Sequence, residues 1–227
     1  MSSPLAVYRD PPPAAPLPEN LLAAARARLA VERATVIRVS PETPPAMREA
    51  MLSVLVDEGV PAVLPIAQRV RAEAWREAPG EAPFEASARL AQRLLEAVHD
   101  LVEYQPDPVD GLFDFFSRVP ETLRPRRGTP RSRLTGRTQG LGDCEDMAVL
   151  ACALLRAVGL RARPVWLSQP GAFQNHVALE VFLPTAAHPS GLPVWAEATI
   201  EGARVGEHPY TVVEREGHGP RIFGVTP

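Results

Sequence analysis

Residues 142–146 read Gly-Asp-Cys-Glu-Asp, and the apolar stretch LACALLRAVGL that soon follows predicts a buried helix that ends before Gly159. Asp143 is a suitable N-cap residue, which places Cys144 at the first position of this helix. The helix N-terminus favours a thiolate, whereas the charges of Asp143, Glu145 and Asp146 oppose one. Cys144 is therefore a candidate nucleophile that needs a base from elsewhere in the chain.

Two later segments alternate apolar and polar residues and predict strands: HVALEVFL at 176–183 and VWAEATI at 194–200. His176 begins the first segment, and Glu197 lies inside the second. If the two strands pair antiparallel with position numbers that add to about 373, the imidazole faces the carboxylate on one face of the sheet. A slip of one residue would separate them. Cysteine, histidine and carboxylate in this order are what a papain-like thiol enzyme needs.

Three segments together carry a family resemblance: GDCEDMAVLACALLRAVGLRARPVW, NHVALEVF and VWAEATIEGARVGEHP. The chain resembles the transglutaminase-like cysteine enzyme superfamily, and most of all the members encoded by tailed phages and prophages. Upstream, a helix that ends in a tyrosine and is followed by Asp-Pro and a proline-threonine-leucine step also fits that subgroup. The residues concerned are Tyr104, Asp107, Pro108, Pro120, Glu121, Thr122 and Leu123. The resemblance covers about 85–210, and more loosely the helices from about 44.

This resemblance implies that Cys144 is the nucleophile, His176 the base and Glu197 the third member of a catalytic triad. Many relatives carry aspartate at the third position, and a glutamate can accept the same imidazole N–H. The oxyanion donor that we expect is the backbone N–H of Cys144, with the Gln139 side chain as a weaker candidate. Water or an amine could resolve the acyl-enzyme, and a peptidase or amidase is preferred over a cross-linking enzyme.

The expected fold class is α+β, with a papain/transglutaminase-like core in which the nucleophile helix packs on an antiparallel sheet. We expect a proline-rich extended arm at 1–18, an N-terminal helical region at 19–83 and the core at 84–227. Helices are predicted at about 20–33, from Met47 to a stop at Gly59, and at 61–77, where Pro65 kinks the helix or marks its start. Strands are predicted at 35–39, 161–167, 176–183, 193–200 and 210–215.

Between Tyr104 and Gly142, nearly forty residues show little periodicity. This segment is rich in arginine without acidic neighbours: Arg124, Arg126, Arg127, Arg131, Arg133 and Arg137. The simplest interpretation is a solvated loop. The alternative is contact with phosphate, nucleic acid or an acidic partner surface, although a net charge of −3 gives no global attraction to polyanions.

Cys144 and Cys152 are eight residues apart on one predicted helix, roughly 12 Å along its axis, so they cannot form a disulfide with each other. Cys152 is expected to be a small buried hydrophobe, and Trp166 and Trp195 core aromatics, one of which could line the cleft. No cofactor is expected, and no metal site, since the sequence has neither Cys-x-x-Cys nor two histidines four residues apart. The start of the chain lacks a secretion signal, and no apolar run reaches the length of a membrane span.

These features predict a cytoplasmic protein, or a component of a virion or phage-like particle assembled in the cytoplasm, without a membrane partner. The expected partners are a protein or peptide substrate and phage structural proteins. A second hypothesis comes from a different class. In it the chain is a non-catalytic structural or assembly component of a phage-like particle that keeps the fold and its triad as a scaffold.

Overall fold

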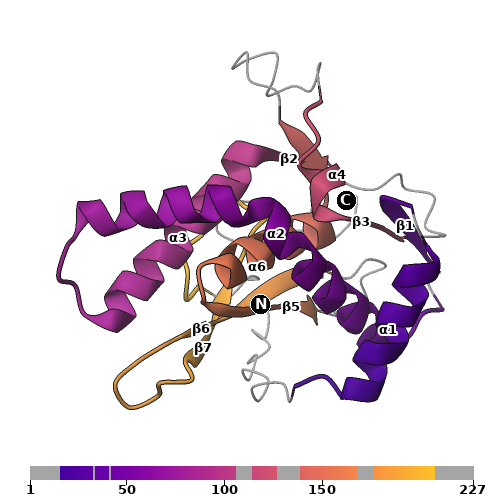
Figure 1. Ribbon diagram of the computed structural model, residues 1–227, viewed down its shortest axis with the longest axis horizontal. Coiled ribbons are helices and arrows are strands. Elements are labelled where there is room, and N and C mark those ends of the chain that lie inside the picture. Colours follow the sequence, from indigo (N-terminus) through magenta and orange to yellow (C-terminus); the bar gives the residue numbers. More distant parts are fainter. Residues whose placement is uncertain are drawn as a thin grey trace, which may run out of the picture.

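The computed structural model describes residues 16–32, 34–40, 42–105, 114–126, 139–167 and 176–207. The helices are α1 (Glu19–Val31), α2 (Pro45–Glu77), α3 (Pro83–Leu101), α4 (Val119–Thr122) and α6 (Cys144–Ala157) (Figure 1). The strands are β1 (Val36–Val39), β2 (Val102–Tyr104), β3 (Asp114–Ser117), β4 (Gly140–Gly142), β5 (Arg161–Leu167), β6 (His176–Leu183) and β7 (Leu192–Ala196). The predicted strand at 210–215 and most of the proline-rich arm lie outside the described residues.

The helix α6 lies at the centre of the molecule, because nearly all of its surface is apolar. Every residue from Cys144 to Leu155 is buried. A helix that is buried on all sides needs neighbours on all sides, and α2 and α3 pack against it together with the sheet formed by β5, β6 and β7 (Figure 1). The buried core is continuous from Leu29 of α1 through α6 to Leu179 of β6.

The sheet has the order β5-β6-β7 and is antiparallel throughout. Its central strand, β6, is buried along seven of its eight residues, which explains why an alternating sequence is also apolar overall. The predicted α+β architecture, with the nucleophile helix against an antiparallel sheet, is confirmed. The predicted strands 161–167 and 176–183 match β5 and β6, whereas β7 ends at Ala196 and not at residue 200.

The prediction of two helices separated at Gly59 is wrong, because α2 is one helix of 33 residues. Gly59 faces the core, where a Cβ atom would overlap the Val119 side chain, so this glycine allows close packing and does not end the helix. Pro61 and Pro65 both lie on the exposed side of α2. The carbonyl groups that lose their helical hydrogen bonds there can be hydrated, and tertiary packing offsets the local cost.

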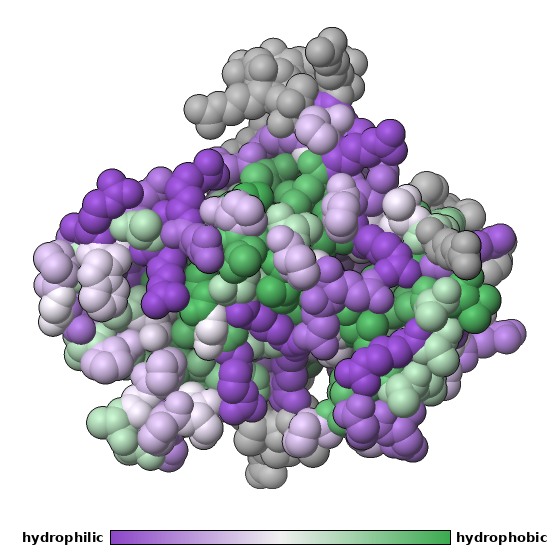
Figure 2. All heavy atoms as spheres, in the orientation of Figure 1, coloured by the Kyte–Doolittle hydropathy of each residue, from purple (hydrophilic) through white to green (hydrophobic). Residues whose placement is uncertain are grey.

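Among the described residues, α2 is also the helix whose length and apolar composition would suffice to cross a membrane. Half of that apolar stretch is buried inside the fold, as is typical of a core helix. Figure 2 shows hydrophobic residues along the middle of the face where α2 runs, with hydrophilic residues on both sides.

The segment between Tyr104 and Gly142 contains short elements that periodicity did not predict, since each has only three or four residues. β3 pairs antiparallel with β1, and β2 pairs parallel with β4. Two of the arginines in this segment do have an acidic neighbour, contrary to expectation: Arg124 and Arg126 pair with Glu121 at 3.5 and 2.5 Å. The other four arginines lie outside the described residues.

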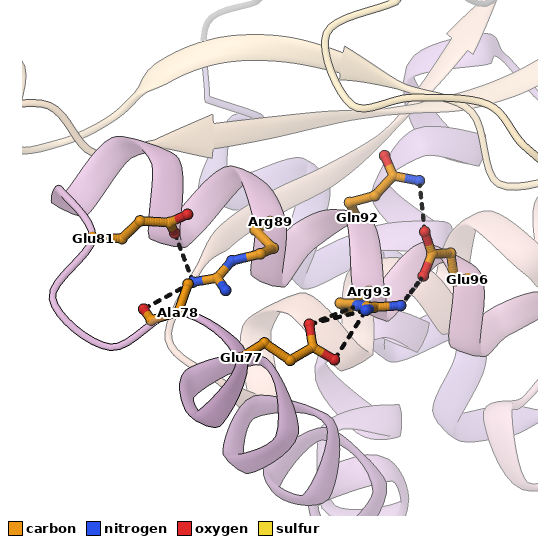
Figure 3. A network of polar contacts seen from close by, with 7 residues as sticks. All are labelled: Glu77, Ala78, Glu81, Arg89, Gln92, Arg93 and Glu96. Atoms are coloured by element: carbon orange, nitrogen blue, oxygen red, sulfur yellow. Dashed lines mark hydrogen bonds and ion pairs between the residues drawn. The ribbon is translucent and has the colours of Figure 1, made fainter.

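The turn between α2 and α3 is held by side chains on both helices (Figure 3). Arg93 of α3 contacts Glu77 at 2.9 Å and Glu96 at 3.1 Å. One turn earlier, Arg89 contacts Glu81 at 2.6 Å and the carbonyl oxygen of Ala78. Because these groups are partly exposed, the network positions α3 beside α2 more than it stabilises the fold.

Candidate active site

The strand that leads into α6 needs two glycines because it passes very close to its neighbours. A Cβ atom on Gly140 would overlap the backbone oxygen of Thr122, and one on Gly142 would lie 2.7 Å from Cβ of Asp146. Asp143 then caps α6 as expected, its carboxylate accepting the backbone N–H of Asp146 at 3.2 Å. These contacts place Cys144 at the first residue of a well-defined helix.

Asp146 connects this helix to a different part of the chain. Its carboxylate accepts the backbone N–H of Ser117 at 2.7 Å, which joins the first turn of α6 to the end of β3. Both residues are buried. The second carboxylate of the Gly-Asp-Cys-Glu-Asp motif therefore has a structural partner.

The thiol of Cys144 is enclosed and has two polar neighbours. Its residue is 8 % exposed, and Sγ donates to Oε2 of Glu145 at 2.9 Å. Sγ also accepts a hydrogen bond from the backbone N–H of Val177 in β6. Because Val177 directly follows His176, this contact brings the sulfur to the residue beside the candidate base.

His176 and Glu197 are in direct contact in the core. Nε2 of His176 lies 2.6 Å from Oε2 of Glu197, and neither side chain is exposed. The other carboxylate oxygen of Glu197 accepts the backbone N–H of Thr199 at 2.7 Å and its hydroxyl at 2.5 Å. Because Nε2 is engaged by Glu197, Nδ1 is the ring nitrogen that does not contact this carboxylate.

The strand register that brings these residues together differs slightly from the predicted one. Leu179 pairs with Ala196, so the paired position numbers add to 375 and not to 373. A difference of two positions keeps the same side chains on the same face of each strand. Glu197, which directly follows β7, therefore still reaches His176.

The electrostatics of this pair favour its ionised form. Burial by itself lowers the pKa of His176, but the charge and hydrogen bond of Glu197, together with the charge of Glu145, raise that pKa above its ordinary value. Burial likewise raises the pKa of Glu197, and the contacts with His176 and Thr199 outweigh it, so the pKa of this carboxyl is lowered. His176 is therefore a stronger base than a free imidazole.

The environment of Cys144 has the opposite effect on the sulfur. Burial raises the pKa of the Cys144 thiol, and the charges of Glu145 and Asp143 and the hydrogen bond to Glu145 raise it further, against a smaller lowering by the Val177 N–H. In this arrangement the sulfur is a protonated thiol. The carboxylates beside the cysteine thus add to the effect of burial, in the direction that the sequence indicates.

Tyr104 and Glu145 are neighbours of the site to which sequence reasoning assigned no role. Tyr104 lies at the end of β2, paired with Gly142 of β4. Burial raises the pKa of Tyr104 far above its ordinary value, and the charges of Cys144, Asp143, Glu145 and Glu197 add to this, so its hydroxyl remains protonated. In the sequence, the feature that could have pointed to Glu145 as a neighbour of the site is its position directly after Cys144. Tyr104 was named in the family resemblance, but its place beside the site follows only from the pairing of β2 with β4.

Gln139 has a structural task that conflicts with its expected role as an oxyanion donor. Its side-chain NH₂ group donates to the carbonyl oxygens of His99 and Asp100 at 2.9 and 2.8 Å, near the end of α3.

Cys152 is fully buried, with a pKa raised by burial to about 12. Both cysteines are free, and no group of three metal-ligating side chains occurs among the described residues.

Both expected core aromatics, Trp166 and Trp195, are partly buried, and Trp166 lies in β5 against a buried arginine. The guanidinium of Arg48 is 5.0 Å from the centre of its indole ring. The backbone N–H of Trp166 donates to Glu49 of α2 at 3.0 Å. Trp166 thus links the sheet to α2.

The segment that carries these side chains matches the model of a known protein family. The model of the transglutaminase-like superfamily matches residues 76–203, which is more than half of the chain. The chain belongs to the transglutaminase-like superfamily. The match runs from the last turn of α2 to beyond β7, so it contains Tyr104, Cys144, His176 and Glu197. A comparison with curated proteins found no match.

Membership of the transglutaminase-like superfamily indicates a cysteine hydrolase or acyltransferase kind of function. The superfamily segment begins inside α2, but α2 packs along α6 and shares the core with it. The N-terminal helices therefore support the segment that carries the candidate site.

Proposed function

We propose that the protein is a cysteine amidase or peptidase in which Cys144 is the nucleophile, His176 the general base and Glu197 the residue that orients the imidazole. The observation that carries the proposal is the convergence of three distant segments. The sulfur of Cys144 contacts the amide of Val177, and the adjacent His176 lies 2.6 Å from Glu197. Thiol acyl transfer requires a cysteine, an imidazole and an orienting carboxylate from separate segments to lie close together.

In the proposed reaction, Nδ1 of the neutral His176 imidazole takes the thiol proton and the Cys144 sulfur forms a bond to the carbonyl carbon of an amide. The carbonyl oxygen becomes an oxyanion near the backbone N–H of Cys144 in the first turn of α6. When the C–N bond breaks, the amine leaves with the proton from the imidazolium, and a thioester remains. Water, deprotonated by His176, then attacks the thioester, releases the carboxylic acid and returns the proton to the sulfur.

The fold supports this assignment through the unequal basicity of the two partners. The pKa of His176 is raised by Glu197, so the imidazole readily holds the proton that the sulfur must lose. Glu197 is held by Thr199 and cannot rotate freely, which keeps Nε2 engaged and Nδ1 directed away from it. An amine could replace water in the second step, which would make the same chemistry a transamidation.

The proposal is tested with purified protein and a mixture of unmodified peptides, followed by mass spectrometry. We expect peptide cleavage and a trapped acyl adduct on Cys144 in the wild type. Cys144→Ala should abolish both, and Glu197→Gln should lower the rate about 10²-fold or more. Cys152→Ala is the matched control, because this thiol is buried and remote from the histidine, and it should retain full activity.

A second candidate function is a non-catalytic assembly component, for example of a phage-like particle. It is favoured by the resting state of the sulfur, which is a largely enclosed thiol bound to a carboxylate. If a folded wild-type protein forms no acyl adduct on Cys144 and Cys144→Ala changes nothing, this second function replaces the first.

A further inference from the structure

The four carboxylates around Cys144 do not have equivalent surroundings. Asp143 caps α6, Asp146 accepts the Ser117 amide, and Glu197 binds His176 and Thr199. Among the described residues, the hydrogen bond that Glu145 forms is with the thiol of Cys144. Among the residues that the structure describes, no arginine forms an ion pair with Glu145, although the residue is only 5 % exposed.

A nearly buried carboxylate without a cation is costly unless something else compensates for it. The thiol is a weak donor and compensates only in part. In the described part of the chain, the titratable groups that interact electrostatically in this region are the imidazole of His176 on β6 and the hydroxyl of Tyr104 on β2. The carboxylates of Asp143, the N-cap of α6, and of Glu197 also take part. Apart from His176, none of these groups carries a positive charge, so the local field is negative and attracts a cation.

From this arrangement we propose that Glu145 recognises an ammonium group on the substrate and, by binding it, releases the Cys144 thiol for reaction. This inference rests on the proposed function, in which Cys144 attacks an amide. It specifies a substrate class: an amide that carries an ammonium group within reach of the nucleophile. It also assigns Glu145 a positioning role, because the residue acts on the thiol and forms no bond to the reacting carbon.

The physical basis is the competition of two donors for one carboxylate. In the free protein, Oε2 of Glu145 accepts the thiol S–H at 2.9 Å, which keeps the proton on the sulfur. A substrate ammonium is a much stronger partner for a carboxylate than a thiol is. Once it binds, the negative charge beside the sulfur is neutralised, and the thiol proton can pass to His176. The enzyme would thus protect its nucleophile until a cationic substrate arrives.

The test measures the thiol itself and needs no natural substrate. The rate of Cys144 alkylation by iodoacetamide, a neutral reagent, is recorded from pH 5 to pH 10 in the Cys152→Ala background, with and without n-propylammonium chloride. Sodium chloride at equal ionic strength is the control. In the protein with Glu145, the ammonium salt should accelerate alkylation in a saturable manner, and sodium chloride should not.

The variant Glu145→Gln should react about tenfold or more faster at neutral pH, with a thiol titration about one pH unit lower, and should no longer respond to the ammonium salt. Glu145→Asp keeps a charge but shortens its reach, so it should respond more weakly than the wild type. If Glu145→Gln alkylates no faster, or if both proteins respond equally to propylammonium, the inference is wrong. If Glu145→Gln does not fold, the saturable response of the Glu145 protein decides the matter alone.

This experiment separates the inference from the proposed function. An unchanged thiol titration in Glu145→Gln overturns the role of Glu145, while peptide cleavage and the acyl adduct still stand or fall on Cys144→Ala and Glu197→Gln. Conversely, a protein without turnover can still show the ammonium response of its thiol.

Discussion

The backbone N–H of Ser117 donates to the carboxylate of Asp146 at 2.7 Å, and this contact joins the end of β3 to the turn of α6 that carries Cys144. The two residues are 29 positions apart in the chain, and both are buried. A short strand and a helix start are thereby held in one orientation. The stability of the fold and the geometry of the candidate site consequently depend on the same side chain.

Replacing Asp146 by alanine should lower the free energy of unfolding by about 2 kcal/mol, since it leaves a buried N–H without its charged acceptor. Asp146→Asn keeps a side-chain oxygen at the same position and should lose clearly less. Urea denaturation followed by circular dichroism provides the comparison. Equal losses for the two variants would mean that the Ser117 contact contributes little.

The His176–Glu197 pair predicts how stability depends on pH. Because the folded pKa of His176 is raised, its contribution is complete below about pH 6.5 and is lost as the pH rises through the folded pKa. Because the folded pKa of Glu197 is lowered, its contribution is complete above about pH 4.5 and is lost as the pH falls through the folded pKa. The stability difference between wild type and Glu197→Gln should therefore be largest between about pH 4.5 and 6.5.

This difference is measured by urea denaturation at a series of pH values, and we expect about 3 kcal/mol at its maximum, as for a buried pair that loses one partner. An exposed glutamate of α3, Glu85, is a suitable control, because Glu85→Gln should show no such maximum. A difference that stays constant across this pH range would contradict an ionised pair.

Gly140 should tolerate no side chain. A Cβ atom there would overlap the backbone oxygen of Thr122, which cannot move without displacing α4, so Gly140→Ala should lose about 3 kcal/mol. Gly159 is the matched comparison, because its φ of +88° is strained for alanine while the space around it is open. Gly159→Ala should cost only about 1 kcal/mol. Thermal unfolding of both variants tests whether close approach matters more than backbone conformation.

Arg48 is a buried arginine whose removal should be much more harmful than that of an exposed one. It pairs with Asp114, donates to the carbonyl oxygens of Thr43 and Ser40 at 3.0 Å each, and stacks on Trp166. Arg48→Met should cost about 2 to 3 kcal/mol, reduced somewhat because Asp114 is partly exposed. Arg48→Lys should not recover the stability lost in Arg48→Met, because an ammonium group lacks the planar set of donors of a guanidinium.

Arg93 provides the control for this comparison, since it forms ion pairs with both Glu77 and Glu96 on the surface between α2 and α3, whereas Arg48 pairs with Asp114 (Figure 3). Its side chain is 46 % exposed, so Arg93→Ala should cost no more than about 1 kcal/mol. The denaturant midpoints of Arg48→Met and Arg93→Ala, each compared with the wild type, measure the two losses of stability. Similar losses at both positions would show that burial is not what makes Arg48 important.

The amino-acid sequence alone was sufficient to predict the elements whose signals are local. The apolar helix after Asp143, the strands at 161–167 and 176–183 and the N-cap itself all follow from residue type and periodicity over a few turns. The order of cysteine, histidine and glutamate could also be read without coordinates. Gly59 and the prolines of α2 were misleading, because their local preferences are overridden by burial against Val119 and by the exposure of Pro61 and Pro65.

Only the tertiary structure decided which groups meet around the sulfur. The contact of Cys144 with Val177, the pairing of β2 that brings Tyr104 to the site, and the strand register that brings Glu197 to His176 all join segments far apart in the chain. The hydrogen bond between Glu145 and the thiol of Cys144 likewise could not be read from the neighbours of Glu145 in sequence. Local patterns determine secondary structure because helices and strands form from adjacent residues, whereas the charge around a buried thiol depends on every element packed against it.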